Sequence, residues 1–262
     1  MTKILVTGAS SGMGYQIATA LVQQGYQVYG AARQVTKMPA NVIPLYLDLT
    51  DEAAIEKMVT QMGPVDMVVN NAGYGAYGAI EDVTLAEARR QFDVNLFGLA
   101  RLTQLVLPQM RAQGHGRIIN IGSMGGRFTT YLGAWYHATK YALEAFTDAL
   151  RMESKPFGIQ VILIEPGGIN TPWGQIAADH LVQSAQGGAY AQQAQKAAQQ
   201  LAATYHSRWL SQPTVIANTV LKAVKRRHPR PRYLVGAGAK PLVLLHTLLP
   251  TRSFDWLMVH FT

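Results

Sequence analysis

Residues 3–14 read KILVTGASSGMG, a short apolar run that leads directly into a glycine-rich turn. The run Lys3–Thr7 predicts a buried β-strand, and apolar residues at helical spacing after Gly14 predict an α-helix. Glycines let the backbone turn tightly, and the free N–H groups at a helix N-terminus bind phosphate. The spacing Gly-x-x-x-Gly-x-Gly is not a P-loop, because no Gly-Lys-Ser/Thr follows. The segment predicts a strand, turn and helix that hold the pyrophosphate of a dinucleotide, although a glycine turn without a ligand has the same pattern.

The chain continues to alternate between predicted strands and helices. Strands are expected at 27–31, 42–47, 65–70, 117–121 and 160–165, and helices at 51–62, 85–113 and 135–155. Thr50 is the expected N-cap of the helix over 51–62, and the helix over 85–113 is expected to break near Pro108. We therefore predict an α/β protein: a Rossmann-type, doubly wound parallel sheet with helices on both faces, largely complete by residue 165.

The regular alternation stops after Pro166-Gly167. Residues 183–205 are rich in Ala and Gln and have weak amphipathicity, so a helical substrate lid over about 170–212 is expected at the ligand edge of the sheet. A surface helix without a gating role is an equal alternative. Residues 213–262 are expected to form a C-terminal helix and tail. No linker composition divides the chain, so we expect one domain over 1–262.

Composition excludes several classes of protein. With 262 residues, 48% hydrophobic and 15% charged, the chain is neither disordered nor collagen-like. The absence of cysteine excludes disulfides and thiolate metal sites, and the seven histidines are not clustered, so we predict no metal. The N-terminus lacks the apolar segment of a signal peptide, which favours a cytoplasmic location. The leucine-rich stretch 233–250 is interrupted by polar residues; we expect it to cover an oligomer surface or contact a membrane without crossing it.

Positive charge is concentrated near the C-terminus. The formal net charge is +8, and six basic residues crowd one segment: Lys222, Lys225, Arg226, Arg227, Arg230 and Arg232. No aromatic residues interleave with them, so a solvated helix end is favoured over a patch that binds nucleic acid or anionic lipid. We therefore expect no nucleic-acid partner.

One basic and one acidic residue bear on which dinucleotide is bound. An NAD site usually places a carboxylate about 20 residues after the glycines, but residues 30–34 here read GAARQ. Arg33 can pair with a 2′-phosphate, which favours NADP(H) while leaving NAD(H) possible; a solvated loop arginine is the alternative. Asp48 is either an acceptor for the adenine amino group or a turn residue before Thr50.

Acid–base chemistry is suggested by Tyr136 and Lys140, which lie one turn apart on one face of a predicted helix. A tyrosine titrates near 10, and a fixed ammonium nearby favours its phenolate. Ser123 follows the predicted strand over 117–121 and can donate a hydrogen bond to a substrate oxygen.

These residues together resemble the short-chain dehydrogenase/reductase family. The glycine turn is followed by Asn70-Asn71-Ala72-Gly73, Asn95, Ser123, Tyr136-x-x-x-Lys140 and Pro166-Gly167, in the family's order and approximate spacing, and the resemblance extends to Thr171. It implies the compact, single-domain oxidoreductase branch, and a homodimer or homotetramer. It implies that Tyr136 is the acid or base, Lys140 holds the nicotinamide ribose and lowers the tyrosine pKa, Ser123 polarises the carbonyl, and Asn95 supports a proton relay.

The resemblance also implies a set of cofactor contacts. They are Gly8, Ser10, Ser11, Gly12, Met13, Gly14, Arg33, Asp48, Leu49, Asn71, Ala72, Gly73, Tyr136, Lys140, Pro166, Gly167, Ile169 and Thr171. Substrate contacts are expected from large apolar residues after the strands: Tyr74, Tyr77, Met124 and Trp173.

The expected function is NADP(H)-dependent interconversion of a hydrophobic ketone or aldehyde and its alcohol. Residues 74–78 and the tail bear a weaker similarity to steroid- and retinol-type members. One alternative is a 3-oxoacyl-carrier-protein reductase, whose acidic partner would meet the basic segment. Another is a non-catalytic NADP-binding sensor.

Overall fold

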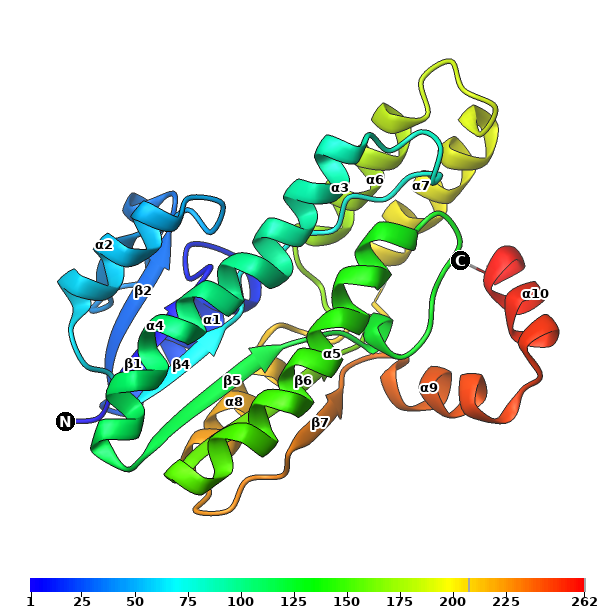
Figure 1. The fold of residues 1–262 in the computed structure, drawn as a ribbon. Helices are drawn as coiled ribbons and strands as arrows, with labels where there is room; N and C mark the ends of the chain where they lie inside the picture. The colour runs from blue at the N-terminus through cyan, green and yellow to red at the C-terminus, as the bar shows by residue number, and fades with distance from the viewer. Residues whose placement is uncertain (207, 262) are drawn as a thin grey trace.

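A parallel sheet of seven strands forms the centre of the described chain (Figure 1). The computed structural model describes residues 1–206 and 208–261. The strands are β1 (Lys3–Thr7), β2 (Gln27–Ala32), β3 (Ile43–Tyr46), β4 (Met67–Asn70), β5 (Gly116–Ile121), β6 (Ile159–Pro166) and β7 (Arg232–Val235). Their order is β3-β2-β1-β4-β5-β6-β7, so the direction of winding reverses between β1 and β4. Ligands of such sheets bind in the crevice at this reversal, beyond the carboxyl ends of the strands.

Helices cover both faces of the sheet, as predicted (Figure 1). They are α1 (Gly12–Gln23), α2 (Glu52–Met62), α3 (Leu85–Phe92), α4 (Gly98–Gln113), α5 (Ala134–Ser154), α6 (Trp173–Ser184), α7 (Ala191–His206), α8 (Thr214–Lys225), α9 (Ala239–Leu248) and α10 (Thr251–Phe261). Alternate residues of β1 enter different cores: Ile4 and Val6 pack with α1 and α8, and Leu5 packs with α2 and α4. The doubly wound prediction is therefore confirmed.

Six of the seven strands are complete by Pro166, as expected, but the seventh strand was not predicted. β7 pairs in parallel with the end of β6, from Leu163↔Arg232 to Pro166↔Val235. The strand has only four residues and follows the basic, proline-containing stretch 226–231, so its apolar signal is weak.

Two local predictions were wrong. Pro108 lies inside α4 without ending it; the long helix changes instead at a π-helical segment, Asp93–Phe97, which carries the buried Asn95. The N-cap of α2 is Asp51, which accepts a hydrogen bond from the Ala54 N–H at 3.1 Å. Thr50 lies one residue before the cap, and its hydroxyl donates to Asp48 instead.

The segment 170–212 contains two packed helices, α6 and α7, which stand beyond the carboxyl ends of the strands (Figure 1). A small apolar cluster joins them to the loop after β4, through Ala79, Leu181 and Ala194. At the C-terminal side, α9 and α10 enclose Phe128 with Val243 and Phe254. No helix in the described parts of the chain combines the length and apolarity that crossing a bilayer requires.

Candidate active site

A cavity of about 600 Å³ lies at the carboxyl ends of β1, β2 and β4, where the winding of the sheet reverses. The predicted cofactor residues in its lining are Gly8, Ser10, Ser11, Gly12, Met13, Arg33, Asp48, Leu49, Asn71, Ala72, Gly73 and Thr171. Of the predicted substrate residues, Tyr74 and Trp173 also line it. The crevice thus brings together residues separated by more than half the chain.

The N-terminus of α1 forms one wall of the cavity. Ser11 makes no side-chain cap there, and the helix has no acidic residue in its first turn, so the backbone N–H groups of this turn are available to an anion. Gly8 has φ 69°, and a Cβ on it would lie 3.0 Å from the Ala72 Cα. Asn71 holds this turn by donating from Nδ2 to the Thr7 carbonyl at 3.0 Å, and its buried Oδ1 has no partner among the described residues. This cradle fits a pyrophosphate.

Gly14 has a packing role rather than a place in the cavity wall. A Cβ at this position would lie 2.2 Å from the Gly8 carbonyl oxygen, a distance that real Cβ atoms do not reach. Only glycine therefore allows α1 to start so close to the turn.

Two arginines, Arg33 and Arg90, line the other end of the cavity near Asp48. Burial alone would raise the pKa of Asp48, but hydrogen bonds from Thr50 and the charges of both arginines lower it. The Thr50 N–H donates to Asp48 Oδ1 at 2.9 Å and the Thr50 hydroxyl at 2.8 Å. Arg90 was missed from the sequence because it lies on α3, far along the chain from the glycine turn and outside any motif. The end of the cavity that would hold an adenosine carries two cations.

The predicted catalytic residues converge beside this crevice. Tyr136 and Lys140 lie on α5, and Ser123 follows β5. Lys140 Nζ donates to the Ile121 carbonyl at 3.1 Å and lies 6.0 Å from the centre of the Tyr136 ring. Burial lowers the pKa of Lys140 to about 8. Burial raises the pKa of Tyr136 to about 12, although a hydrogen bond with Ser123 opposes the rise. The shift of Tyr136 is thus opposite to the one expected, because desolvation of the phenolate dominates.

Asn95 joins the loop after β4 to helix α5. Its Oδ1 accepts from the Tyr74 N–H at 3.1 Å, and its Nδ2 donates to the Tyr74 carbonyl at 2.9 Å and to Thr139 Oγ1 at 3.0 Å. The π-helical segment Asp93–Phe97 is what turns this side chain inward. Asn95 therefore holds the wall of the crevice against the helix that carries Tyr136 and Lys140.

Aromatic rings from the lid segment and from the β4 loop cover Tyr136. The Trp173 ring lies 5.1 Å from the Tyr136 ring, and the Tyr77 ring lies 5.6 Å from it. Tyr136 is only 8% exposed, and it does not line the cavity. Tyr205 of α7 packs on Trp173 at 6.0 Å, a contact that no sequence motif indicated.

His137, which no sequence motif indicated, holds the Ser123 loop through hydrogen bonds at both ring nitrogens. Its Nδ1 lies 2.8 Å from the Gly125 carbonyl, which only accepts, and its Nε2 lies 3.1 Å from the Thr130 N–H, which only donates. Nδ1 therefore carries the proton. Burial lowers the pKa of His137, so the ring stays neutral.

Some predicted residues lie elsewhere. Met124 packs against the cluster of Phe128 and Val243, facing the C-terminal helices, and is outside the cavity lining; its contact with substrate stays a prediction. Pro166, Gly167 and Ile169 lie outside the cavity lining as well. The Gly167 N–H donates to the Val235 carbonyl at 2.7 Å, which joins the ends of β6 and β7.

The basic segment divides into two parts. Arg232 is half-buried in ion pairs with Glu144, Asp148 and Glu165, which corrects the prediction that it belongs to a solvated turn. The other members, Lys222, Lys225, Arg226, Arg227 and Arg230, are exposed. They lie before β7, and hence at the amino-end edge of the parallel sheet, opposite the crevice (Figure 1).

Comparison with known proteins gives consistent matches. A family model described as short chain dehydrogenase matches residues 2–181. The probable short-chain type dehydrogenase/reductase VdlC of Helicobacter pylori is 33% identical over 259 residues, which are 96% of this chain and 94% of that protein. The NADPH-dependent 3-dehydrocapnine reductase of Ornithobacterium rhinotracheale is 36% identical over 193 residues, which are 67% of this chain and 68% of that protein.

A solved structure extends the likeness to the fold. The crystal structure of a short-chain dehydrogenase from Streptomyces avermitilis has a TM-score of 0.79 and 33% sequence identity, covering 94% of this chain and 92% of that one. The chain therefore belongs to the short-chain dehydrogenase/reductase family of NAD(P)-dependent oxidoreductases.

Proposed function

We propose that the protein is an NADP(H)-dependent reductase that converts a hydrophobic ketone or aldehyde into its alcohol, with Tyr136 as the proton donor. The observation that carries the proposal is the convergence of Tyr136, Lys140 and Ser123 beside a crevice with an open helix N-terminus. A protein that only binds NADP as a sensor does not need these three groups close together, because it transfers no proton.

Each residue has a separate role in the reduction. When bound, NADPH supplies the hydride to the carbonyl carbon. Ser123 donates a hydrogen bond to the carbonyl oxygen, and Tyr136 transfers the phenolic proton to that oxygen as negative charge develops there. Lys140 places its ammonium behind Tyr136, where a positive charge stabilises the phenolate left after proton transfer. Asn95 keeps the β4 loop and α5 at the spacing that this geometry requires.

The preference for NADP(H) is supported by the two cations at the adenosine end. Arg33 and Arg90 both line the cavity there, and a 2′-phosphate is a dianion that guanidinium groups bind well. One relative carries NADPH dependence in its name, the reductase of Ornithobacterium rhinotracheale.

A hydrophobic substrate is supported by the groups around Tyr136. The rings of Tyr77 and Trp173 pack on it, Tyr205 packs on Trp173 in turn, and Trp173 is the first residue of α6. A substrate reaches the phenol when the segment with α6 and α7 moves Trp173 aside, so this segment acts as a lid. The exposed basic residues before β7 lie at the opposite edge of the sheet. A carrier protein bound to them would therefore not lie at this entrance.

The proposed function is tested by product analysis. The purified protein is incubated with NADPH and matched series of apolar ketones, aldehydes and polar sugars, together with an acyl-thioester mimic, and the products are identified by mass spectrometry. We expect alcohols from the apolar series. Reduction of the thioester mimic or the sugars in preference to the apolar compounds would contradict the proposed substrate class.

Replacing Trp173 with alanine tests the aromatic cover. We expect Trp173→Ala to raise the KM for a bulky apolar ketone at least about fivefold, because an aromatic contact of this kind contributes about 1 kcal/mol beyond its buried area. The measurement is steady-state kinetics with the best substrate. Trp256→Ala, on the exposed face of α10, is the matched control and should leave KM unchanged. Equal effects of the two changes would remove Trp173 from the substrate site.

A further inference from the structure

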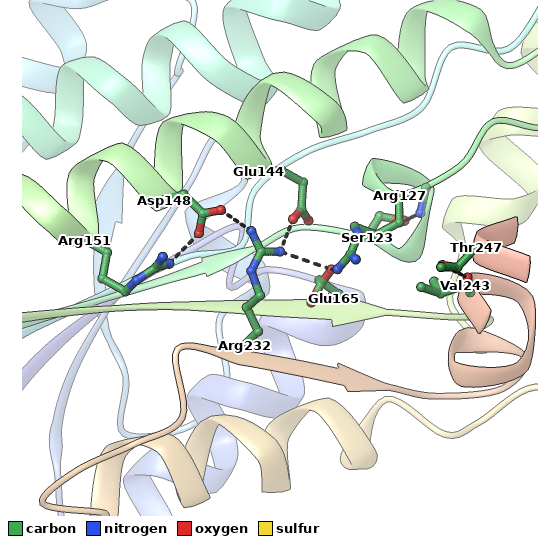
Figure 2. A network of polar contacts seen from close by, with 10 residues as sticks. Ser123, Arg127, Glu144, Asp148, Arg151, Glu165, Arg232, Val243 and Thr247 are labelled. Atoms are coloured by element: carbon green, nitrogen blue, oxygen red, sulfur yellow. Dashed lines mark hydrogen bonds and ion pairs between the residues drawn. The ribbon is translucent and has the colours of Figure 1, made fainter.

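A cluster of charged side chains, of which Glu144 and Glu165 are buried, lies beneath the loop that carries Ser123 (Figure 2). We call it the β7 charge cluster; its members are Arg127, Glu144, Asp148, Glu165 and Arg232. Arg232 lies at its centre and contacts all three carboxylates: Glu144 by a short hydrogen bond, Asp148 at 2.5 Å and Glu165 at 3.4 Å. Arg127 contacts Glu165 at 3.2 Å from the other side.

This cluster is costly to bury. Glu165 is 1% exposed and Glu144 is 8% exposed, and withdrawing a carboxylate from water costs several kcal/mol. Burial raises the pKa of Glu144 to about 7, a rise that Arg232 opposes and Glu165 increases. Two apolar side chains would fill the same space at a lower cost, so stability alone does not account for Glu144.

Glu144 lies next to the loop that carries Ser123 and one turn from Lys140. It follows Lys140 by one turn on the same face of α5. A Cβ at Gly126 would lie 2.8 Å from Glu144 Cγ and 2.9 Å from the Lys140 carbonyl, and one at Gly122 would lie 3.5 Å from Glu144 Oε1. The carboxylate therefore fills the space under the Ser123 loop, which two glycines leave open for it.

The two oxygens of Glu144 have different surroundings. Oε2 is bound by Arg232, whereas Oε1 is buried and has no hydrogen-bond partner among the described residues. Lys140 Nζ donates to the carbonyl of Ile121, the last residue of β5 and the one immediately before Gly122. One oxygen is thus anchored by β7, and the other faces the loop that starts at Gly122, next to the carbonyl that binds the Lys140 ammonium.

We propose that Glu144, held by Arg232, is a positioning residue for the reaction: its negative charge keeps Lys140 in the ammonium form beside Tyr136. The inference rests on the proposed function, because it assigns a role in that reaction. It also explains why β7, at the edge of the sheet, supplies a half-buried arginine to the interior.

The sign of the effect follows from the surrounding charges. The titratable and charged groups around Lys140 and Glu144 are Tyr136, Tyr141 and Asp148 on α5, Arg127 after the Ser123 loop, Glu165 on β6 and Arg232 on β7; the π-helical segment presents the neutral Asn95. The Glu144 charge raises the pKa of Lys140 against the lowering by burial. Removing that charge, while the cation of Arg232 remains, must therefore lower the pKa of Lys140.

The direct test is the titration of Lys140 in the protein without added ligand. Lysine labelled with ¹³C at Cε is followed by NMR from pH 6 to 11, and the Lys140→Arg variant assigns the signal. We expect Glu144→Gln to lower the pKa of Lys140 by about one unit, the usual effect of one nearby charge. The upper limb of the pH profile of kcat for carbonyl reduction should move down by the same amount.

Asp148→Asn is the matched control. It removes one carboxylate from the same arginine, but Asp148 lies two turns from Lys140 on α5 and is already paired with Arg151. We expect this variant to leave the pKa of Lys140 within about 0.3 unit of its original value. A merely structural role for the cluster would give the two variants similar losses of stability and no shift in the Lys140 titration, which would overturn the proposal.

A second variant keeps the proposal testable if Glu144→Gln does not fold. Glu144→Leu combined with Arg232→Met replaces the ion pair with apolar groups, a change that buried pairs commonly tolerate. Asp148 keeps Arg151 and Glu165 keeps Arg127 in this variant. The pKa of Lys140 should fall here too, although by less than in Glu144→Gln: Glu144 is the charge that acts on Lys140 most strongly, and the loss of the Arg232 cation opposes its effect only in part. An unchanged value would overturn the proposal. Because the titration requires no turnover, failure of the proposed function appears separately, as a lack of carbonyl reduction by the wild-type protein.

Discussion

Tyr136→Phe is expected to lower kcat for carbonyl reduction about 10³-fold, within the range of a lost general acid. The phenylalanine ring keeps the contacts with Tyr77 and Trp173 but has no proton to give to the carbonyl oxygen. The affinity for NADPH should change less than threefold, because the cavity that fits the dinucleotide is lined by other residues. Single-turnover kinetics and fluorescence titration with NADPH measure the two quantities separately.

The control for this variant is Tyr141→Phe. Tyr141 is exposed, lies on the same helix and is outside the cavity lining, so its loss should leave kcat unchanged. If Tyr136→Phe instead lost NADPH affinity while retaining most of its kcat, Tyr136 would be a cofactor contact and another group would be the proton donor.

Arg33→Asp is expected to have the second largest effect, a reversal of cofactor preference. The change removes a cation that can pair with the 2′-phosphate and places an anion beside it, a loss of about 3 kcal/mol or about 100-fold in kcat/KM for NADPH. NADH has a free 2′-hydroxyl, to which a carboxylate can bind, so its kcat/KM should rise. The measurement is the ratio of kcat/KM for the two cofactors.

Arg89→Asp is the matched control because it makes the same change of charge on α3, at a position outside the cavity lining. It should leave the ratio nearly unchanged. Arg90→Gln should weaken NADPH about tenfold without improving NADH, since it removes one of two cations and adds no carboxylate. If Arg33→Asp left the ratio of kcat/KM for NADPH and NADH unchanged, other residues would bind the 2′-phosphate.

Local signals in the sequence were sufficient for most of the framework. The glycine turn, the first helix and six of the strands could be placed because apolar periodicity and glycine spacing act over short distances. The convergence of Ser123, Tyr136 and Lys140 was also predictable, but through the family resemblance, since no short-range pattern brings a loop after β5 onto α5.

Long-range contacts account for what the sequence did not predict. β7 is only four residues long and is recognisable as a strand mainly because β6 pairs with it. In the sequence, Arg232 is not distinguishable from the other residues of the basic segment. It contacts Glu144 because β7 pairs with β6 in the sheet. The direction of the Tyr136 pKa shift depends on burial by Tyr77 and Trp173, which come from distant segments.

The measurement that tests the central claim most directly is the initial rate of NADPH and NADH oxidation, followed at the nicotinamide absorbance, for the wild-type protein and Tyr136→Phe with the same series of apolar ketones and aldehydes. We predict carbonyl-dependent oxidation of NADPH by the wild type, slower oxidation of NADH, and a rate near the background for the variant. Tight NADPH binding with no oxidation by the wild type, or equal rates for the wild type and the variant, would contradict the account.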